Sequence, residues 1–135
     1  MMLRVFISYN FKDRQLAHGI RQLFDLPDGE SIGTPVFVSK DVSMDGETAI
    51  DHEIRTTMET CQCALFVIGN NVHNSPWINR EAQLAISRGL GLVAVRLPGT
   101  TGALPHVLAP LKLPLAGWSP DDVRFALDQS RLRRH

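Results

Sequence analysis

A short apolar run in the middle of the chain, residues 63–69 (CALFVIG), constrains the fold more than any other feature of the sequence. Its length and the polar residues on either side indicate a strand that is buried on both faces. Such strands are typical of parallel sheets that helices cover on each side. Similar segments, rich in β-branched or aliphatic residues, occur at residues 3–9, 35–39, 91–97 and, more briefly, 113–116.

Apolar residues between the first strands recur at helical spacing. One such stripe predicts a first helix and consists of Leu16, Ile20, Leu23 and Phe24. We expect this helix to end near Leu26, and Asn10 or Asp13 could cap its start. A repeat every four residues predicts a second helix, on Ile50, Ile54 and Met58.

Two later helices have clear start signals, because a serine cap is followed by proline at the first helical position. These are Ser75-Pro76 and Ser119-Pro120. We expect the helices to run to about Arg88, before Gly89, and to about Gln129. Residues 98–114 are rich in proline and glycine, so they are expected to be mostly loop with one short helical turn.

Strands alternate with helices along the whole chain, which predicts an α/β fold. We expect a single-domain, doubly wound parallel sheet of flavodoxin type, with about five strands in the order 2-1-3-4-5. The domain is expected to cover residues 1–130, with a basic tail at 131–135. Sheets of this type bind ligands beyond the carboxyl ends of their strands, which here are the loops after Tyr9, Ser39, Gly69 and Leu97.

Composition argues against several classes of partner. The chain has 135 residues, with 14 Lys plus Arg against 14 Asp plus Glu, so no net field attracts nucleic acid or anionic lipid. No secretory signal and no run long enough to span a bilayer is visible, so we expect a cytoplasmic protein without membrane contact.

Cys61 and Cys63 are predicted to be reduced packing residues. The five histidines show no ligand spacing, and no metal site is expected.

The usual sites of this fold class are missing from the sequence. There is no phosphate-binding P-loop, no glycine fingerprint for a dinucleotide in the turn at residues 9–13, and no nucleophile elbow. The third strand ends in Gly69-Asn70 rather than in an aspartate, which disfavours a phosphoryl-receiver domain. Any chemistry must therefore come from other residues.

Glu81, in the third predicted helix, is the side chain best suited to take part in a reaction. On a helical wheel Ile78, Ala82 and Ala85 face the sheet, and Glu81 lies at the margin of that face, one turn after Trp77. Partial burial there tends to raise the pKa of a carboxyl group. The alternative is a surface glutamate that is paired with Arg80 or Arg88.

The end of the first strand supplies further candidates. Ser8 and Tyr9 end the strand, and Asn10 and Phe11 begin the loop, so we expect all four across the same cleft from Glu81. Aromatic rings beside hydroxyl and amide groups suit stacking on a base or on a nicotinamide ring. Alternatively, Tyr9 only caps the core.

Three segments in order resemble a TIR domain. They are the strand VFISY at residues 5–9, the W-x-x-x-E helix in residues 74–85 (NSPWINREAQLA), and the pair Gly117-Trp118 before the last helix. The chain is most similar to the bacterial TIR-like family that includes the Thoeris anti-phage protein ThsB. The resemblance covers nearly the whole chain. Trp77 is followed by Ile78, where many TIR domains have Trp-Cys.

The resemblance implies NAD cleavage, with Glu81 as the catalytic residue. NAD would be the substrate, no metal would be needed, and the product would be an ADP-ribose-type nucleotide, cyclic or conjugated. That product would activate a downstream effector in anti-phage defence, and the active form would be a homo-oligomer. A carboxylate near the ribose can stabilise the oxocarbenium-like cation that remains when neutral nicotinamide leaves. The alternative is a non-enzymatic TIR scaffold, or a nucleotide-sensing module, that acts through TIR–TIR assembly.

The same resemblance assigns a substrate-binding role to other residues. The loop after Tyr9 and the loop at residues 40–46 would line the pocket, together with Asn74. Lys40 would meet a phosphate as a point charge or would be a solvated loop lysine. Trp77 would wall the ribose site or would simply pack.

Overall fold

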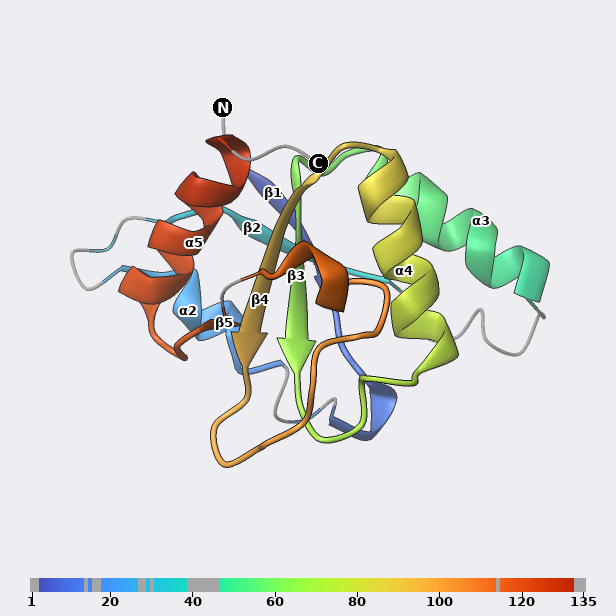
Figure 1. The fold of residues 1–135 in the computed structure, drawn as a ribbon. Helices are drawn as coiled ribbons and strands as arrows, with labels where there is room; N and C mark the ends of the chain where they lie inside the picture. Colours follow the sequence, from blue (N-terminus) through green and yellow to red (C-terminus); the bar gives the residue numbers. More distant parts are fainter. Residues whose placement is uncertain are drawn as a thin grey trace.

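The computed structural model describes residues 3–13, 15, 18–26, 29, 31–38, 47–113 and 115–132, except for the side chains of Phe11, Leu132 and residues 47–50. Figure 1 shows one layer of strands between two layers of helices. The strands are β1 (Arg4–Ser8), β2 (Thr34–Phe37), β3 (Cys63–Ile68), β4 (Gly91–Arg96) and β5 (Leu115–Ala116). The α-helices are α2 (Ile20–Leu23), α3 (Glu47–Met58), α4 (Pro76–Ser87) and α5 (Pro120–Leu132). The short 3-10 helices are η1 (Phe11–Asp13) and η3 (Ala109–Leu111).

The five strands form one parallel sheet in the order β2-β1-β3-β4-β5, which confirms the predicted fold class and strand order. β1 pairs with β3 so that Phe6 lies opposite Ala64, and β3 pairs with β4 so that Ala64 lies opposite Leu92. The carboxyl ends of β1, β3 and β4 therefore meet along one edge of the sheet, where ligands bind in folds of this type.

Two hydrophobic clusters, one on each face of the sheet, make up the core. The α3/α4 cluster joins Phe6, Ala64 and Phe66 to Ile54 of α3 and Ile78 of α4, among others. The α2/α5 cluster on the other face has these central members: Val5, Ile7, Leu65, Ile20, Val123 and Leu127. Figure 1 shows the same division, with α3 and α4 together on one side of the strands and α2 and α5 on the other.

The central strand β3 is buried at all six positions, as predicted for residues with helices on both faces. The two cysteines are also buried, and neither is in a disulfide. Cys61 belongs to the α3/α4 cluster and Cys63 to the α2/α5 cluster. Burial raises the pKa of the Cys61 thiol, which keeps it protonated and unreactive near neutral pH. Both are packing residues, as the sequence indicated.

The start and end of α4 follow the predicted signals. The side chain of Ser75 accepts a hydrogen bond of 3.4 Å from the backbone amide of Ile78, and Pro76 occupies the first turn. Gly89 has a φ of +70°, a left-handed conformation that glycine adopts without steric cost, and it follows the cap residue Arg88. This capping fixes where the helix begins relative to the sheet edge.

The first predicted helix is interrupted within the residues that the structure describes. Gln15 is helical, His18 and Gly19 form a turn, and α2 runs from Ile20 to Leu23. Glycine has a low helix propensity, and Gly19 serves here as the N-terminal boundary without a side-chain cap. The apolar stripe nevertheless predicts the buried side chains correctly, because Ile20, Leu23 and Phe24 are all buried. Leu16, the other member of the stripe, lies outside the described residues. Asn10 caps η1 instead, because its Oδ1 accepts from the amide of Lys12 at 2.9 Å.

The remaining elements agree with the expected pattern within a few residues. The Oγ of Ser119 accepts a hydrogen bond from the amide of Asp122 at the start of α5. The predicted helical turn within residues 98–114 is η3. In the part of the chain that the structure describes, none of the helices has the length and apolar character needed to cross a bilayer.

Candidate active site

Glu81 and Ser8 meet in the interior of the protein, at the carboxyl edge of the sheet. The Oγ of Ser8, the last residue of β1, donates a hydrogen bond of 2.9 Å to Oε1 of Glu81 on α4. Ser8 is 1% exposed and Glu81 is 4% exposed. A buried carboxyl group requires a polar partner, and Ser8 supplies one from the central part of the sheet. The structure thus brings together two residues that the sequence placed near each other, but in direct buried contact rather than across a cleft.

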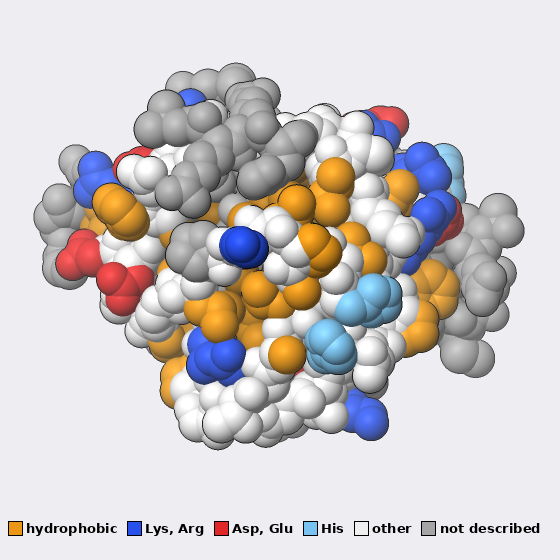
Figure 2. All heavy atoms as spheres, in the orientation of Figure 1, with side chains coloured by type: hydrophobic (Ala, Val, Ile, Leu, Met, Phe, Trp, Pro, Cys, Tyr) orange, Lys and Arg blue, Asp and Glu red, His pale blue; other side chains and the backbone are white. Residues whose placement is uncertain are grey.

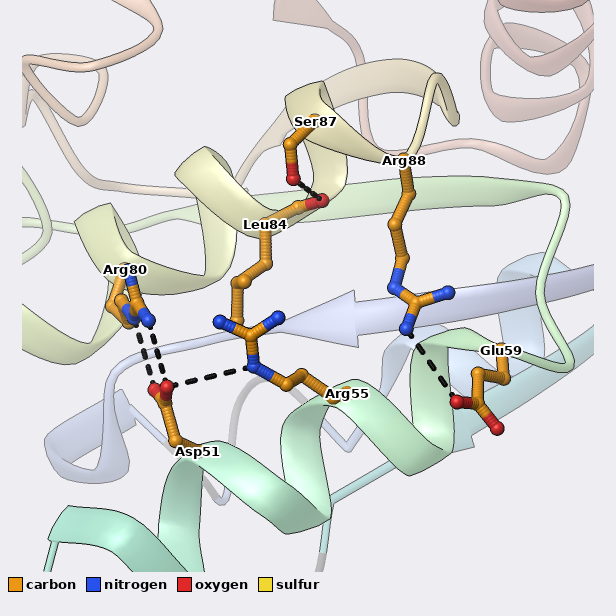
Figure 3. Close-up of polar contacts among 7 residues, drawn as sticks. All are labelled: Asp51, Arg55, Glu59, Arg80, Leu84, Ser87 and Arg88. Carbon is orange, nitrogen blue, oxygen red and sulfur yellow. Dashed lines mark hydrogen bonds and ion pairs between the residues drawn. The ribbon is translucent and has the colours of Figure 1, made fainter.

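The alternative of a surface glutamate paired with a neighbouring arginine is wrong. Arg80 instead binds Asp51 of α3 through two hydrogen bonds of 2.9 and 2.7 Å, and Arg88 lies 3.6 Å from Glu59 (Figure 3). Both arginines point toward α3, on the side where their acidic partners lie. Glu81 is buried instead, as is Leu84 on the same helix, and each is 4% exposed.

The ion pairs between α3 and α4 are centred on Asp51. The hydrogen bonds from Arg80 hold the pKa of the Asp51 carboxyl below its usual range, and Arg55, 3.6 Å away, adds to the effect. The same pairing raises the pKa of Arg80. Figure 3 shows both guanidinium groups directed at this one carboxylate. The network ties α4 to α3.

Tyr9 does not face Glu81. It is 5% exposed and belongs to the α2/α5 cluster, where its ring makes edge contacts with His18 at 5.6 Å and with Phe37 at 5.9 Å between centroids. Successive residues of a strand point to opposite faces, so Ser8 and Tyr9 cannot both turn toward α4. The interpretation of Tyr9 as a core residue fits this position, although the residue still lies at the ligand-binding edge.

The loop after β1 is attached to the loop after β3. The Nδ2 of Asn10 donates a hydrogen bond of 2.7 Å to the backbone carbonyl of Asn71. Asn10 is half-buried, so part of this residue remains exposed to solvent at the edge of the sheet, two positions after Ser8. Phe11 begins η1, and its side chain is among those that the structure does not describe.

The other predicted substrate contacts are less closely grouped. Asn74 is exposed in the loop before α4, and Trp77 is 39% exposed in the first turn of that helix. Trp77 is therefore not a core residue, and its indole ring is accessible one turn before Glu81. Lys40 and the rest of the loop at residues 40–46 lie outside the described residues.

Asn79 is an organising residue that the sequence interpretation missed. It is 5% exposed, and its Nδ2 donates hydrogen bonds of 3.0 Å to the carbonyls of His73 and Ser75. Its Oδ1 accepts one of 2.9 Å from the amide of Val107. The available signal was its position on the buried stripe, four residues after Ser75, where a polar residue must find internal partners. Asn79 joins the loops after β3 and β4 two residues before Glu81.

One cavity of about 370 Å³ opens elsewhere, between β4, β5 and α5. It is lined mainly by apolar side chains, including Leu92, Leu115 and Phe125, and by none of the predicted site residues. We place the candidate site at Glu81 rather than in this cavity, because the cavity lacks a buried ionisable group. Within the described residues no group of three or more His, Cys, Asp or Glu side chains could hold a metal ion.

Comparison with known proteins agrees with the fold. Residues 6–102 match the family described as the TIR-like domain of Thoeris protein ThsB. No curated protein matches the chain. The crystal structure of the TIR domain of the Toll-related receptor TRR-2 from the lower metazoan Hydra magnipapillata is similar, with a TM-score of 0.57, 16% identity, and coverage of 96% of this chain and 94% of that one. That likeness shows the fold alone. Since the family match spans more than half of the sequence, the chain belongs to the ThsB TIR-like domain family.

Proposed function

We propose that this chain is an NAD-cleaving TIR-like enzyme of anti-phage defence. It would break the bond between nicotinamide and ribose and release an ADP-ribose-type nucleotide, cyclic or conjugated, that activates a downstream effector. Membership of the ThsB TIR-like family supports the role in defence. The observation that carries the enzymatic part is the buried carboxyl group of Glu81, held by Ser8 at the carboxyl edge of the sheet.

The main catalytic group that this reaction requires is one carboxylate close to the ribose. When the bond between the ribose carbon and the nicotinamide nitrogen breaks, both electrons go to the nitrogen and nicotinamide leaves as a neutral molecule. Positive charge remains on the ribosyl carbon. A carboxylate in surroundings poor in water stabilises such a cation more strongly than one in bulk solvent. A nucleophilic group of the same nucleotide, a separate acceptor molecule or water then attacks the carbon, and any proton that the nucleophile loses passes to the solvent.

Burial has a consequence for how the enzyme would be controlled. Because Glu81 is only 4% exposed, a ribose can contact its carboxylate only after covering groups move. Binding energy from the substrate, from a trigger or from assembly with further copies would have to supply that movement. We therefore expect little activity from the isolated chain and more from the triggered or assembled form.

The direct test follows nicotinamide release. Concentrated wild-type protein is incubated with NAD, with and without extract of phage-infected cells, and the products are separated by chromatography and identified by mass. Glu81→Gln keeps the size of the side chain but removes its charge, and should reduce release by about 10²-fold or more. Glu59→Gln, on the surface of the protein beside Arg88, is the matched control and should act like wild type. Equal release by wild type and Glu81→Gln under every condition would contradict the proposal.

A scaffold that acts through TIR–TIR assembly is the second candidate, and exposed apolar side chains favour it. Phe125 is 66% exposed and Leu115 is 39% exposed, both beside the cavity at β5. Figure 2 shows hydrophobic side chains gathered in the middle of the face that carries β4 and the segment after it. If cells producing Glu81→Gln resist phage normally while Phe125→Glu abolishes resistance, the scaffold accounts for the function and the enzyme does not.

A further inference from the structure

Two histidines that are far apart in the sequence are neighbours on the surface. His73 lies in the loop between β3 and α4, and His106 lies 33 positions later, in the segment after β4. Their ring centroids are 6.2 Å apart, with an angle of 75° between the ring planes. Both side chains are exposed, and Figure 2 shows two imidazole groups side by side on this face.

Each ring is oriented by a hydrogen bond from the same type of nitrogen. The Nδ1 of His73 lies 2.7 Å from the carbonyl oxygen of Leu104, and the Nδ1 of His106 lies 3.3 Å from the carbonyl oxygen of His73. A carbonyl oxygen can only accept, so Nδ1 must carry the hydrogen in both rings. In the neutral form the lone pair is then on Nε2. Among the described residues, neither Nε2 has a hydrogen-bond partner.

This is the arrangement in which proteins present histidine to a metal ion. A ligating imidazole typically donates its other ring N–H to a backbone carbonyl or a carboxylate, which fixes the tautomer and the ring direction. With Zn–N bonds of about 2.0–2.1 Å, two imidazoles on a tetrahedral ion have centroids roughly 5 Å apart. A shift of about 1 Å in two exposed side chains would bring His73 and His106 to that separation.

We propose that His73 and His106 form a two-histidine site for a divalent transition metal ion, with water completing the coordination. Imidazole ligands suit Zn²⁺, Cu²⁺ and Ni²⁺, whereas Mg²⁺ and Ca²⁺ prefer oxygen ligands that the site does not offer. The buried cysteines do not compete for the ion, since neither is accessible. Neither proposed ligand is among the residues assigned to a reaction at Glu81.

A bound ion would reinforce an existing connection between two loops. The amide of His106 already donates a hydrogen bond of 3.1 Å to the carbonyl of His73, and Asn79 links the same two segments from inside. The backbone therefore holds both ligands near their working positions before the ion arrives, which lowers the entropy that binding must overcome. Metal binding should stabilise the folded state, because the unfolded chain does not keep the two rings together.

Titration of the untagged chain with Zn²⁺ at about pH 7.5 tests this site. Calorimetry should give one ion per chain, and the Nε2 resonances of His73 and His106 should shift together in NMR spectra. His106→Ala should weaken binding by about tenfold or more, because it removes one of two ligands. His52→Ala, an exposed histidine on α3, is the control and should leave binding unchanged. Mg²⁺ should have no effect.

His73→Asn tests the second ligand. The asparagine side chain can still donate a hydrogen bond toward the carbonyl of Leu104, so the variant should lose zinc affinity without losing its fold. Circular dichroism and thermal unfolding without metal should show that both variants fold. The site is refuted if wild type binds no Zn²⁺ below millimolar concentration. It is also refuted if His73→Asn and His106→Ala each bind as tightly as wild type, or if only one of the two resonances shifts.

Discussion

The hydroxyl group of Ser8 donates a hydrogen bond of 2.9 Å to the carboxyl group of Glu81, across 73 positions of sequence and between two buried side chains. This contact connects the end of β1 to the second turn of α4. It sets the direction of the Glu81 carboxyl group, because the strand on which Ser8 lies is fixed by β2 and β3 on either side.

Replacing Ser8 by alanine should destabilise the protein by about 1–3 kcal/mol, because the carboxyl group of Glu81 loses a buried donor. Equilibrium unfolding in urea measures the change. Ser87→Ala is the control, since Ser87 is exposed on the same helix and its hydroxyl only bonds the carbonyl of Leu84. We expect the control to stay within about 0.5 kcal/mol of wild type. Equal stability of the two variants would mean that the Ser8 contact does not matter in solution.

Replacing Asn79 by alanine should loosen the segment after β4. Three hydrogen bonds are lost at once, and the amide of Val107 is left without its acceptor. We expect a destabilisation of about 2–3 kcal/mol and faster hydrogen exchange at the Val107 amide. Asn74→Ala, an exposed asparagine five residues earlier, should change neither quantity. Unchanged exchange at Val107 in Asn79→Ala would contradict this account of the loop.

The ion pair of Asp51 should contribute to stability in a defined pH range. Its hydrogen bonds to Arg80 depress the pKa in the folded state, so the contribution is present above the unfolded pKa of about 3.9. This contribution to stability is lost as the pH falls through the pKa that Asp51 has in the folded protein. Asp51→Asn should therefore cost up to about 1 kcal/mol near neutral pH, since the pair is partly exposed, and almost nothing at about pH 2.

Unfolding curves of Asp51→Asn and wild type at several pH values test this expectation. Glu59→Gln serves as the comparison, because the contact from Arg88 to Glu59 is longer, at 3.6 Å, and Glu59 is 62% exposed. Its effect on the free energy of unfolding should be smaller at every pH. A difference between Asp51→Asn and wild type that did not shrink in acid would overturn the assignment.

The thiol of Cys61 should react slowly in the native protein. Burial raises its pKa, so the thiolate that reacts with alkylating agents is scarce near neutral pH and the sulfur is also shielded. We expect labelling by iodoacetamide to be at least about tenfold faster in denaturant than in buffer. Rapid native labelling at Cys61, located by mass spectrometry after digestion, would show that the α3/α4 cluster opens readily.

Replacing Gly102 by alanine should displace the loop after β4. A Cβ atom at this position would overlap the backbone carbonyl oxygen of Gly69, which follows β3. Backbone cannot yield as a flexible side chain does, so we expect a loss of about 1–3 kcal/mol of stability. Gly99→Ala gives no such overlap but occupies a left-handed conformation with φ of +77°, so it should cost about 1 kcal/mol. Thermal unfolding of the two variants compares both effects.

Much of the fold follows from local patterns in the sequence. The order of the strands could be predicted because buried strands that alternate with helices admit few arrangements. The start of α4 could be predicted because Ser75 and Pro76 form a local cap. The extent of α2 could not, since Gly19 interrupts a helix whose apolar stripe continues on both sides of it in the sequence.

The candidate site was partly predictable for the same reason. Helical periodicity placed Glu81 beside the buried face, and the structure makes its burial deeper than the predicted margin. Tyr9 and Ser8 are neighbours in the sequence, but strand alternation sends the two side chains to opposite faces of the sheet. The partners of Asn79 and the meeting of His73 with His106 depend on the path of a loop between β4 and β5, which no local pattern encodes.

The alternation at the end of β1 also restricts how this protein can change over evolution. Ser8 and Tyr9 are adjacent in the chain but serve opposite faces of the sheet. Inserting or deleting one residue within β1 would exchange them, turning a phenol ring toward Glu81 and a hydroxyl group into an aromatic cluster. Homologous chains should therefore tolerate substitutions in this strand far better than any change in its length.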